Sequence, residues 1–180
     1  MKDKFTLRAE REGYKARSVY KLKEINNRFK LIEKGDRVLD LGAWPGSWTQ
    51  YCLEKASEVV SVDKKKLNFG KPIVCDVFKD EIFDKVKGKF DVIVSDMAPM
   101  TSGIKELDEG GSFRLVMRAL DIAEKLLKKG GNFLVKMFES EETEEVLGRV
   151  KKEFRSVKIY RPKATKKRSS EIYILGKNKK

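Results

Sequence analysis

The chain has 180 residues, with 41 Lys/Arg against 28 Asp/Glu and no histidine. Without histidine, a Ser-His nucleophile and most zinc sites are excluded, and proton transfer has to use Lys, Asp, Glu or Tyr. The length suits one hydrophobic core, no apolar run reaches the roughly 18 residues of a membrane span, and the N-terminus lacks an apolar signal core. We therefore expect one domain over residues 1–180, a monomer in the cytoplasm, with no membrane contact and no metal.

Helices are predicted where apolar residues recur every three or four positions, and strands where apolar runs are short. In the first half we predict helix 17–29 with Ser18 as N-cap, strand 37–42, helix 47–56, strands 58–63 and 72–76, and helix 79–87. The second half continues with strand 90–99, a loop through Gly103, Gly110 and Gly111, helix 112–131 between a Ser112 cap and a Gly130 stop, strand 132–138, helix 140–154, and strands 157–162 and 171–177.

This alternation of strands and helices predicts an α/β fold with a mostly parallel sheet and helices on both faces. The last two strands are joined only by the basic loop KATKKRSS, which is too short for a parallel crossover, so this pair must be antiparallel. A parallel sheet closed by an antiparallel C-terminal hairpin is the Rossmann-like, seven-stranded architecture of S-adenosylmethionine-dependent methyltransferases.

The basic residues gather at the two ends of the chain. Residues 1–37 hold 12 Lys/Arg against 6 Asp/Glu, residues 161–180 hold 8 against 1, and the stretch between them holds 21 of each. Two basic ends around a neutral centre are typical of nucleic-acid-binding proteins, although they also raise solubility. We predict a basic helical extension over 1–30, a catalytic core over 31–180 and a nucleic-acid partner.

A glycine-containing loop, VLDLGAWPGSW, follows the first predicted strand. Its spacing, Gly42-x-x-x-Gly46, matches neither the dinucleotide fingerprint of NAD-dependent oxidoreductases nor the phosphate loop of NTPases. Asp63, 17 residues past Gly46, is placed to accept hydrogen bonds from ribose hydroxyls, and Asp76 is placed to face an adenine edge. Acids near such a loop suit a cationic sulfonium nucleoside better than a polyphosphate, while a generic tight turn is the alternative.

Three charged residues interrupt or border apolar strands. Lys136 lies inside NFLVKMF, Asp96 ends the strand of FDVIVSD, and Glu171 opens EIYIL. A buried, unpaired charge is costly, so each needs a partner or a chemical role. A structural ion pair between Lys136 and Asp96 is the simplest alternative to a catalytic role.

Motifs over nearly the whole chain resemble the FtsJ/RrmJ family of ribosomal RNA large-subunit 2′-O-methyltransferases, and an archaeal member is expected. The matching stretches are ARSVYKLKEI, VLDLGAWPGSWTQ, VVSVD, CDVF, DVIVSDMAP, GNFLVKMF and RPKATKKRSSEIYILG. Trp44 and Ser47 stand where the family loop usually has alanine and a second glycine. The resemblance implies S-adenosylmethionine as cofactor and a uridine in the A loop of 23S rRNA, within the large ribosomal subunit, as target.

The resemblance also implies roles for particular residues. The family's catalytic Lys, Asp, Lys and Glu fall on Lys21, Asp96, Lys136 and Glu171, with Lys136 as the candidate base. The cofactor-binding set is Gly42, Pro45, Gly46, Trp48, Asp63, Asp76 and Asp96. If Lys21 and Glu171 reach one site, both basic ends must flank it, so the expected RNA contacts are Arg8, Arg11, Lys15, Arg17, Lys163, Lys166, Lys167 and Arg168.

The expected reaction is in-line attack by a ribose 2′-hydroxyl on a methyl group carried by positive sulfur. The enzyme has to align the reacting centres and accept the hydroxyl proton, and a lysine can do this when burial or a neighbouring cation lowers its pKa. Two alternatives stay open at this point. The target is another RNA, such as a tRNA, or the chain is a non-catalytic RNA-binding module on a methyltransferase fold.

Overall fold

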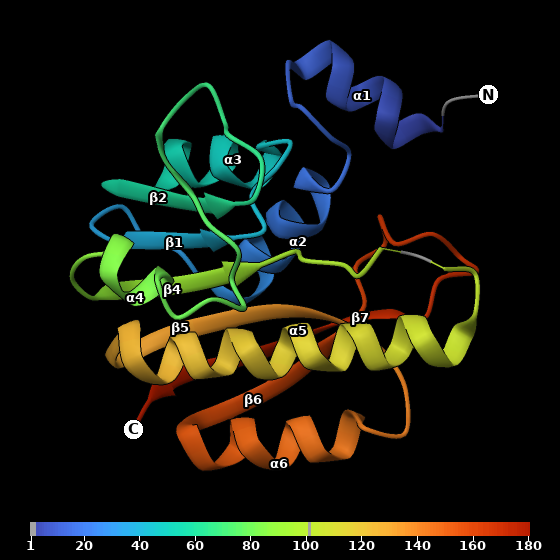
Figure 1. Cartoon of the computed structure of the whole chain (residues 1–180). Coiled ribbons are helices and arrows are strands. Elements are labelled where there is room, and N and C mark those ends of the chain that lie inside the picture. Colours follow the sequence, from blue (N-terminus) through green and yellow to red (C-terminus); the bar gives the residue numbers. More distant parts are fainter. Residues whose placement is uncertain (1–2, 101) are drawn as a thin grey trace.

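A computed structural model describes residues 3–100 and 102–180 of the chain. Its centre is a seven-stranded sheet with the strand order β3-β2-β1-β4-β5-β7-β6 (Figure 1). The strands are β1 Arg37–Leu41, β2 Glu58–Asp63, β3 Lys71–Val74, β4 Phe90–Ser95, β5 Leu127–Phe138, β6 Phe154–Tyr160 and β7 Glu171–Lys179. The helices are α1 Lys4–Glu12, α2 Val19–Phe29, α3 Ser47–Lys55, α4 Ile82–Lys85, α5 Lys105–Leu126 and α6 Thr143–Glu153.

Strands β1 to β5 pair in parallel, and β7 pairs antiparallel with both β5 and β6. The predicted mostly parallel sheet with an antiparallel C-terminal hairpin is therefore confirmed. The order reverses between β1 and β4, because β1 leads to β2 and β3 on one side while β4 leads to β5 on the other. In open α/β sheets, ligands bind outside the carboxyl ends of the strands at such a switch point.

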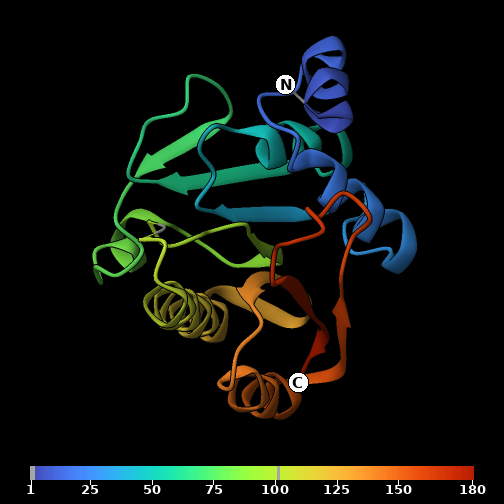
Figure 2. The same cartoon turned by 90° about the vertical axis from the view of Figure 1, so that its right-hand side faces the viewer.

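Helices lie on both faces of the sheet (Figure 2), and an apolar cluster fills the space on each face. One face packs against α4, α5 and α6 through residues such as Val116, Leu120 and Val146. The other packs against α2 and α3 through residues such as Leu22 and Trp48. Helices on both faces leave the edge at the carboxyl ends of the parallel strands as the place where loops converge.

The α5 region differs from the prediction at both ends. Gly110 and Gly111 lie inside α5 rather than in a loop, and a side chain on Gly111 would meet Cβ of Pro99 at 2.8 Å. Glycine at this position lets the helix pack closely against the chain that follows β4. The glycine therefore marks a close helix contact, where the sequence pattern predicts a loop. Ser112 is accordingly no helix cap: it is buried, and its Oγ accepts a hydrogen bond from the backbone N–H of Phe138 at 2.9 Å.

The predicted helix stop at Gly130 was also wrong. The helix ends at Leu126, and β5 begins at Leu127, which is buried and pairs with Phe90 of β4. Burial of Leu127 against the sheet outweighs the helical periodicity that KLLKK continues. The remaining differences are smaller. Ser18 stands at the start of α2 without a side-chain cap bond, helix 79–87 shortens to α4, and α1 was expected only as part of a helical extension.

Across residues 3–100 and 102–180, no helix combines the length and apolar composition needed to span a bilayer.

Candidate active site

The β5–β7 ladder brings the charged strand residues to one face of the sheet. Lys136 pairs directly with Tyr173, and Phe138 pairs with Glu171. Side chains alternate between faces along a strand, so Lys136, Tyr173 and Glu171 share the face that α2 and α3 cover. Asp96 follows the last residue of β4, which is next to β5 in the sheet.

Lys136 and Tyr173 both reach Asp96. Nζ of Lys136 donates to the backbone oxygen of Asp96 at 2.7 Å and lies 3.2 Å from its Oδ1. The hydroxyl of Tyr173 donates to the same Oδ1 at 2.8 Å. Only 9% of the Lys136 side chain and 17% of the Asp96 side chain are exposed, so this ion pair is largely shielded from water.

Burial, with the nearby Asp96 and Glu171 carboxylates, raises the pKa of Tyr173 well above its ordinary value. The phenol therefore stays protonated and acts as a hydrogen-bond donor to Asp96. Sequence reasoning missed this residue, because an aromatic side chain in EIYIL reads as ordinary core. The available signal was its position: Tyr173 lies two residues after Glu171 and so faces the same side of the strand.

The second charged pair joins the N-terminal part of the chain to its C-terminal hairpin. Nζ of Lys21, on α2, lies 2.6 Å from Oε1 of Glu171 at the start of β7, and both side chains are mostly buried. Glu171 also stands opposite Phe138 in the ladder, two positions from Lys136. The structure thus brings all four predicted catalytic residues to one end of the β4–β5–β7 part of the sheet.

The loop between β1 and α3 carries two glycines with positive φ, Gly42 at 72° and Gly46 at 112°. A side chain on Gly42 would meet Met97 at 2.2 Å, and one on Gly46 would meet Phe69 at 2.4 Å. Both positions therefore require glycine on conformational and steric grounds. They let the backbone of this loop lie close to neighbouring groups at the switch point.

Two predicted cofactor acids lie at the same edge. Asp63, the last residue of β2, accepts hydrogen bonds from the backbone N–H groups of Trp44 at 3.0 Å and Lys65 at 2.8 Å. It therefore ties the glycine loop to β2. Asp76 follows β3; the N–H of Phe78, and then Lys64 at 3.0 Å, lower the pKa of its carboxyl.

Lysines stand closer to this loop than the sequence reading assumed. Lys64 pairs with Asp76, and Nζ of Lys65 lies 4.1 Å from the centre of the exposed Trp44 ring. The two carboxylates and the close-approach glycines still fit a nucleoside with ribose hydroxyls and a positively charged centre. Both lysines are exposed, and they do not belong to a phosphate-binding sequence of the GxxxxGK[ST] type.

Trp48, also predicted to bind cofactor, is buried in the core. Its indole N–H donates to the backbone oxygen of Ser18 at 2.9 Å, and its ring stacks on Tyr173 with centroids 5.9 Å apart. Any cofactor contact by this residue is left to its backbone, because the first N–H groups of α3 have no intrahelical partner. Its side chain instead packs against the Tyr173 ring.

A further acid lies under the glycine loop. Asp40 of β1 is fully buried, and its Oδ2 accepts a hydrogen bond from Thr49 at 2.7 Å, whose hydroxyl also contacts Ser61 at 2.9 Å. Its Oδ1 has no hydrogen-bond partner among the described residues. Burial raises the pKa of Asp40 to about 7.

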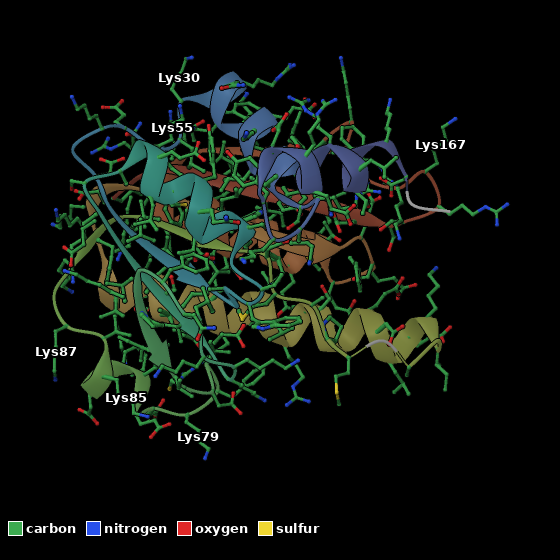
Figure 3. The ribbon with its side chains drawn as sticks, turned by 90° about the horizontal axis from the view of Figure 1, so that it is seen from above. Lys30, Lys55, Lys79, Lys85, Lys87 and Lys167 are labelled. Carbon is green, nitrogen blue, oxygen red and sulfur yellow. The ribbon has the colours of Figure 1, made fainter. Side chains whose placement is uncertain are left out.

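The two basic ends of the chain meet beside this edge of the sheet. Arg17 contacts both Asp3 and the backbone oxygen of Ala164, so it links α1 to the β6–β7 loop. Glu24 of α2 accepts the N–H of Lys163 at 2.9 Å. The other predicted RNA contacts are exposed, and Lys167 projects at one end of the molecule in Figure 3. These are Arg8, Arg11, Lys15, Lys163, Lys166, Lys167 and Arg168.

Comparison with known proteins matches residues 14–179 to the FtsJ-like methyltransferase family. Proteins named ribosomal RNA large subunit methyltransferase E are 44% identical in Methanothrix thermoacetophila and 40% in Methanothermobacter thermautotrophicus, over 98% of this chain and 72% and 90% of theirs. A crystal structure described as a ribosomal RNA methyltransferase from Plasmodium falciparum has a TM-score of 0.81 at 29% identity, over 92% of this chain and 98% of that one. The chain therefore belongs to the FtsJ-like methyltransferase family.

Proposed function

We propose that this chain transfers a methyl group from S-adenosylmethionine to the 2′-hydroxyl of a ribose in large-subunit ribosomal RNA. The observation that carries the proposal is the convergence of Lys136, Asp96, Lys21 and Glu171 beside the switch point of the sheet. The relatives named ribosomal RNA large subunit methyltransferase E support the choice of RNA. A uridine in the A loop of 23S rRNA, presented on the large subunit, is the specific target we propose.

S-adenosylmethionine, when bound, supplies a methyl group on positive sulfur, whose departure as a neutral thioether needs little acid catalysis. Asp63 and Asp76 are the side chains that would hold its nucleoside part, beside the backbone of Gly42 and Gly46. The fit rests on the chemistry of these groups: carboxylates accept hydrogen bonds from hydroxyl and amino groups, and glycine allows close backbone approach.

The chain's own task is to orient the ribose hydroxyl and take its proton. Lys136, in its neutral amine form, is our proposed base, because only the amine has a lone pair that can accept the hydroxyl proton. Asp96 holds Nζ of Lys136, and Tyr173 in turn holds the Asp96 carboxylate, so the position of Nζ is set before the substrate arrives. Lys21 and Glu171 form the second pair of the site and are proposed to hold the hydroxyl in place.

Ribose-methylation mapping on total RNA tests the proposal. RNA from cells that carry the gene, lack it, or carry only a Lys136→Ala copy would be digested and analysed by mass spectrometry. We expect one 2′-O-methylated uridine of the large-subunit rRNA to disappear in the second and third samples. Loss of a tRNA methylation instead would reassign the target, and no change in any RNA would support a non-catalytic RNA-binding role.

A further inference from the structure

A hollow of about 540 Å³ lies between α1, α2 and the chain that follows β6. Three aromatic side chains line it: Phe5 from α1, Tyr20 from α2 and Tyr160 at the end of β6. Phe5 and Tyr20 stand 5.7 Å apart between ring centroids. We call this hollow the flank pocket. Figure 2 shows that α2 and the β6–β7 connection run side by side, so the pocket is assembled from both basic ends of the chain.

The charge of the flank pocket is positive. Arg8, Lys23, Arg28 and Lys163 line it, against a single carboxylate, that of Glu24. Glu24 already accepts hydrogen bonds from the hydroxyl of Tyr160 at 2.7 Å and from the backbone N–H of Lys163 at 2.9 Å. The Glu24 carboxylate therefore holds Tyr160 and Lys163 together in the pocket wall. These contacts satisfy part of its hydrogen-bonding capacity.

The cations differ in how far they are engaged. Arg8 and Lys23 both contact Glu12, at 2.6 Å and 3.6 Å. Arg28 and Lys163 are exposed; Arg28 lies over the Tyr160 ring, and Lys163 gives its backbone N–H to Glu24. These two side chains are the ones best placed to contact an incoming anion.

The flank pocket adjoins the candidate active site through two short connections. Tyr20 precedes Lys21, which pairs with Glu171 in the site. Tyr160 pairs in the β6–β7 ladder with Tyr173, whose hydroxyl binds Asp96. The Cα atoms of directly paired residues in an antiparallel ladder lie about 5 Å apart, so Tyr160 of the pocket is a close neighbour of Tyr173 in the candidate active site.

We propose that the flank pocket binds a nucleotide of the substrate RNA next to the target ribose. Its base would stack against the aromatic wall at Phe5, and its phosphate would contact Lys163 and Arg28, whose guanidinium lies over the Tyr160 ring, 5.2 Å from its centroid. Aromatic faces that stack bases, combined with cations that meet the backbone, are the recurring design of single-strand binding sites. This inference rests on the proposed function, since it takes RNA as the substrate.

The test measures RNA binding without methyl transfer. The full chain would be titrated with a short fluorescein-labelled single-stranded RNA of mixed sequence, at several salt concentrations, by fluorescence anisotropy. Three variants probe the pocket: Arg28→Gln/Lys163→Gln for the phosphate contacts, Phe5→Leu for stacking, and Tyr160→Phe, which keeps the ring. Lys85→Gln/Lys87→Gln is the matched control, because it removes two exposed lysines at the end of α4 and just after it, and α4 covers the opposite face of the sheet from α2 (Figure 3).

We expect distinct signatures for the two kinds of contact. The Arg28/Lys163 variant should lower the slope of log affinity against log salt by up to about 1.4, at about 0.7 for each phosphate contact. Phe5→Leu should weaken binding about five- to a hundredfold with an unchanged slope, since base stacking is not ionic. Tyr160→Phe and the control pair should bind like the wild type.

Two results would overturn the flank pocket. The first is an equal loss of affinity and slope in the pocket pair and the control pair, which would indicate net charge alone. The second is wild-type binding by Phe5→Leu and the pocket pair together, with folding of both verified by thermal unfolding. If a polyglutamate peptide displaces the RNA from wild type but not from the pocket pair, the site selects acidic peptides and the RNA assignment is wrong.

The same experiment separates this inference from the proposed function. RNA binding with the predicted pocket signatures, but no methyl transfer to any RNA, would leave the pocket standing and reject the enzyme activity. Normal methyl transfer, with wild-type affinity and KM for RNA in every pocket variant, would support the enzyme activity and reject the flank pocket.

Discussion

Lys136 and Tyr173 are direct partners in the β5–β7 ladder, and both side chains end on the carboxylate of Asp96. An antiparallel pair inserted next to a parallel strand makes this arrangement possible. The parallel strand β4 supplies an acid at its carboxyl end, and the ladder supplies a cation and a phenol from opposite chain directions. Three of the predictions below depend on this edge of the sheet.

Lys136→Ala should abolish methyl transfer while cofactor binding is retained. Lys136 is the only cation paired with Asp96 among the described residues, and its replacement removes the proposed proton acceptor. Because the partner carboxylate is mostly buried, the variant should also lose about 1–3 kcal/mol of unfolding free energy. Lys129→Ala, at the exposed start of the same strand, is the control. Near-normal single-turnover rates would reject Lys136 as the base.

Tyr173→Phe should lower kcat roughly tenfold at nearly unchanged KM, because about 1.4 kcal/mol corresponds to a factor of ten. The substitution keeps the ring stacked on Trp48 and removes only the hydroxyl that binds Asp96. Steady-state kinetics with the target RNA measures both constants. A rise in KM with normal kcat would mean that the Tyr173 hydroxyl contributes to RNA binding and does not position the Asp96 carboxylate.

Asp63→Ala should weaken binding of S-adenosylhomocysteine by about 1–3 kcal/mol, since charge-assisted hydrogen bonds are lost. Part of that loss would come through the loop, because Asp63 also holds the N–H of Trp44. Titration calorimetry gives the affinity, and Asp84→Ala, an exposed acid of α4, is the control. Equal affinity in wild type and Asp63→Ala would remove this residue from the cofactor site.

Asp40 predicts a pH dependence of stability. Its pKa rises from 3.8 to about 7 on folding, so the folded state holds the proton more tightly than the unfolded state. The stability this contributes is fully present below about pH 4 and is lost as pH rises through about 7. Asp40→Asn cannot ionise, so the wild type should lose stability relative to this variant between those pH values. Denaturant unfolding at several pH values measures it, and a constant difference would show that Asp40 stays charged.

The strand pattern and the charged residues that border strands were predictable from the sequence. A lone Lys136 in an apolar strand and an acid at the end of β4 are local signals; Lys136 is buried, and the Asp96 side chain is only 17% exposed. The limits of α5 were not predictable, because Gly111 marks a contact with Pro99 and Leu127 joins the sheet through tertiary pairing. Tyr173 and the flank pocket were not predictable for the same reason: each depends on contacts with residues that are distant in sequence.

The β6–β7 loop leads to the last prediction, which concerns RNA docking. Lys166, Lys167 and Arg168 are all exposed, and the loop is tied to α1 and α2 by Arg17 and Glu24. The three cations are therefore carried on a braced loop beside the candidate active site. Replacing all three with glutamine should lower the salt slope of RNA binding by up to about 2.7, at about 0.7–0.9 for each lost phosphate contact.

Anisotropy titrations at several salt concentrations measure that slope. Lys55→Gln/Lys85→Gln/Lys87→Gln removes the same charge from lysines toward the opposite end of the molecule, and it separates local contact from net charge (Figure 3). Cofactor affinity should stay at the wild-type value in both triple variants, because Asp63 and the glycine loop lie outside both sets. A wild-type slope in the loop variant, or a loss of cofactor binding instead, would mean that RNA approaches along another surface and that the loop cations serve only solvation.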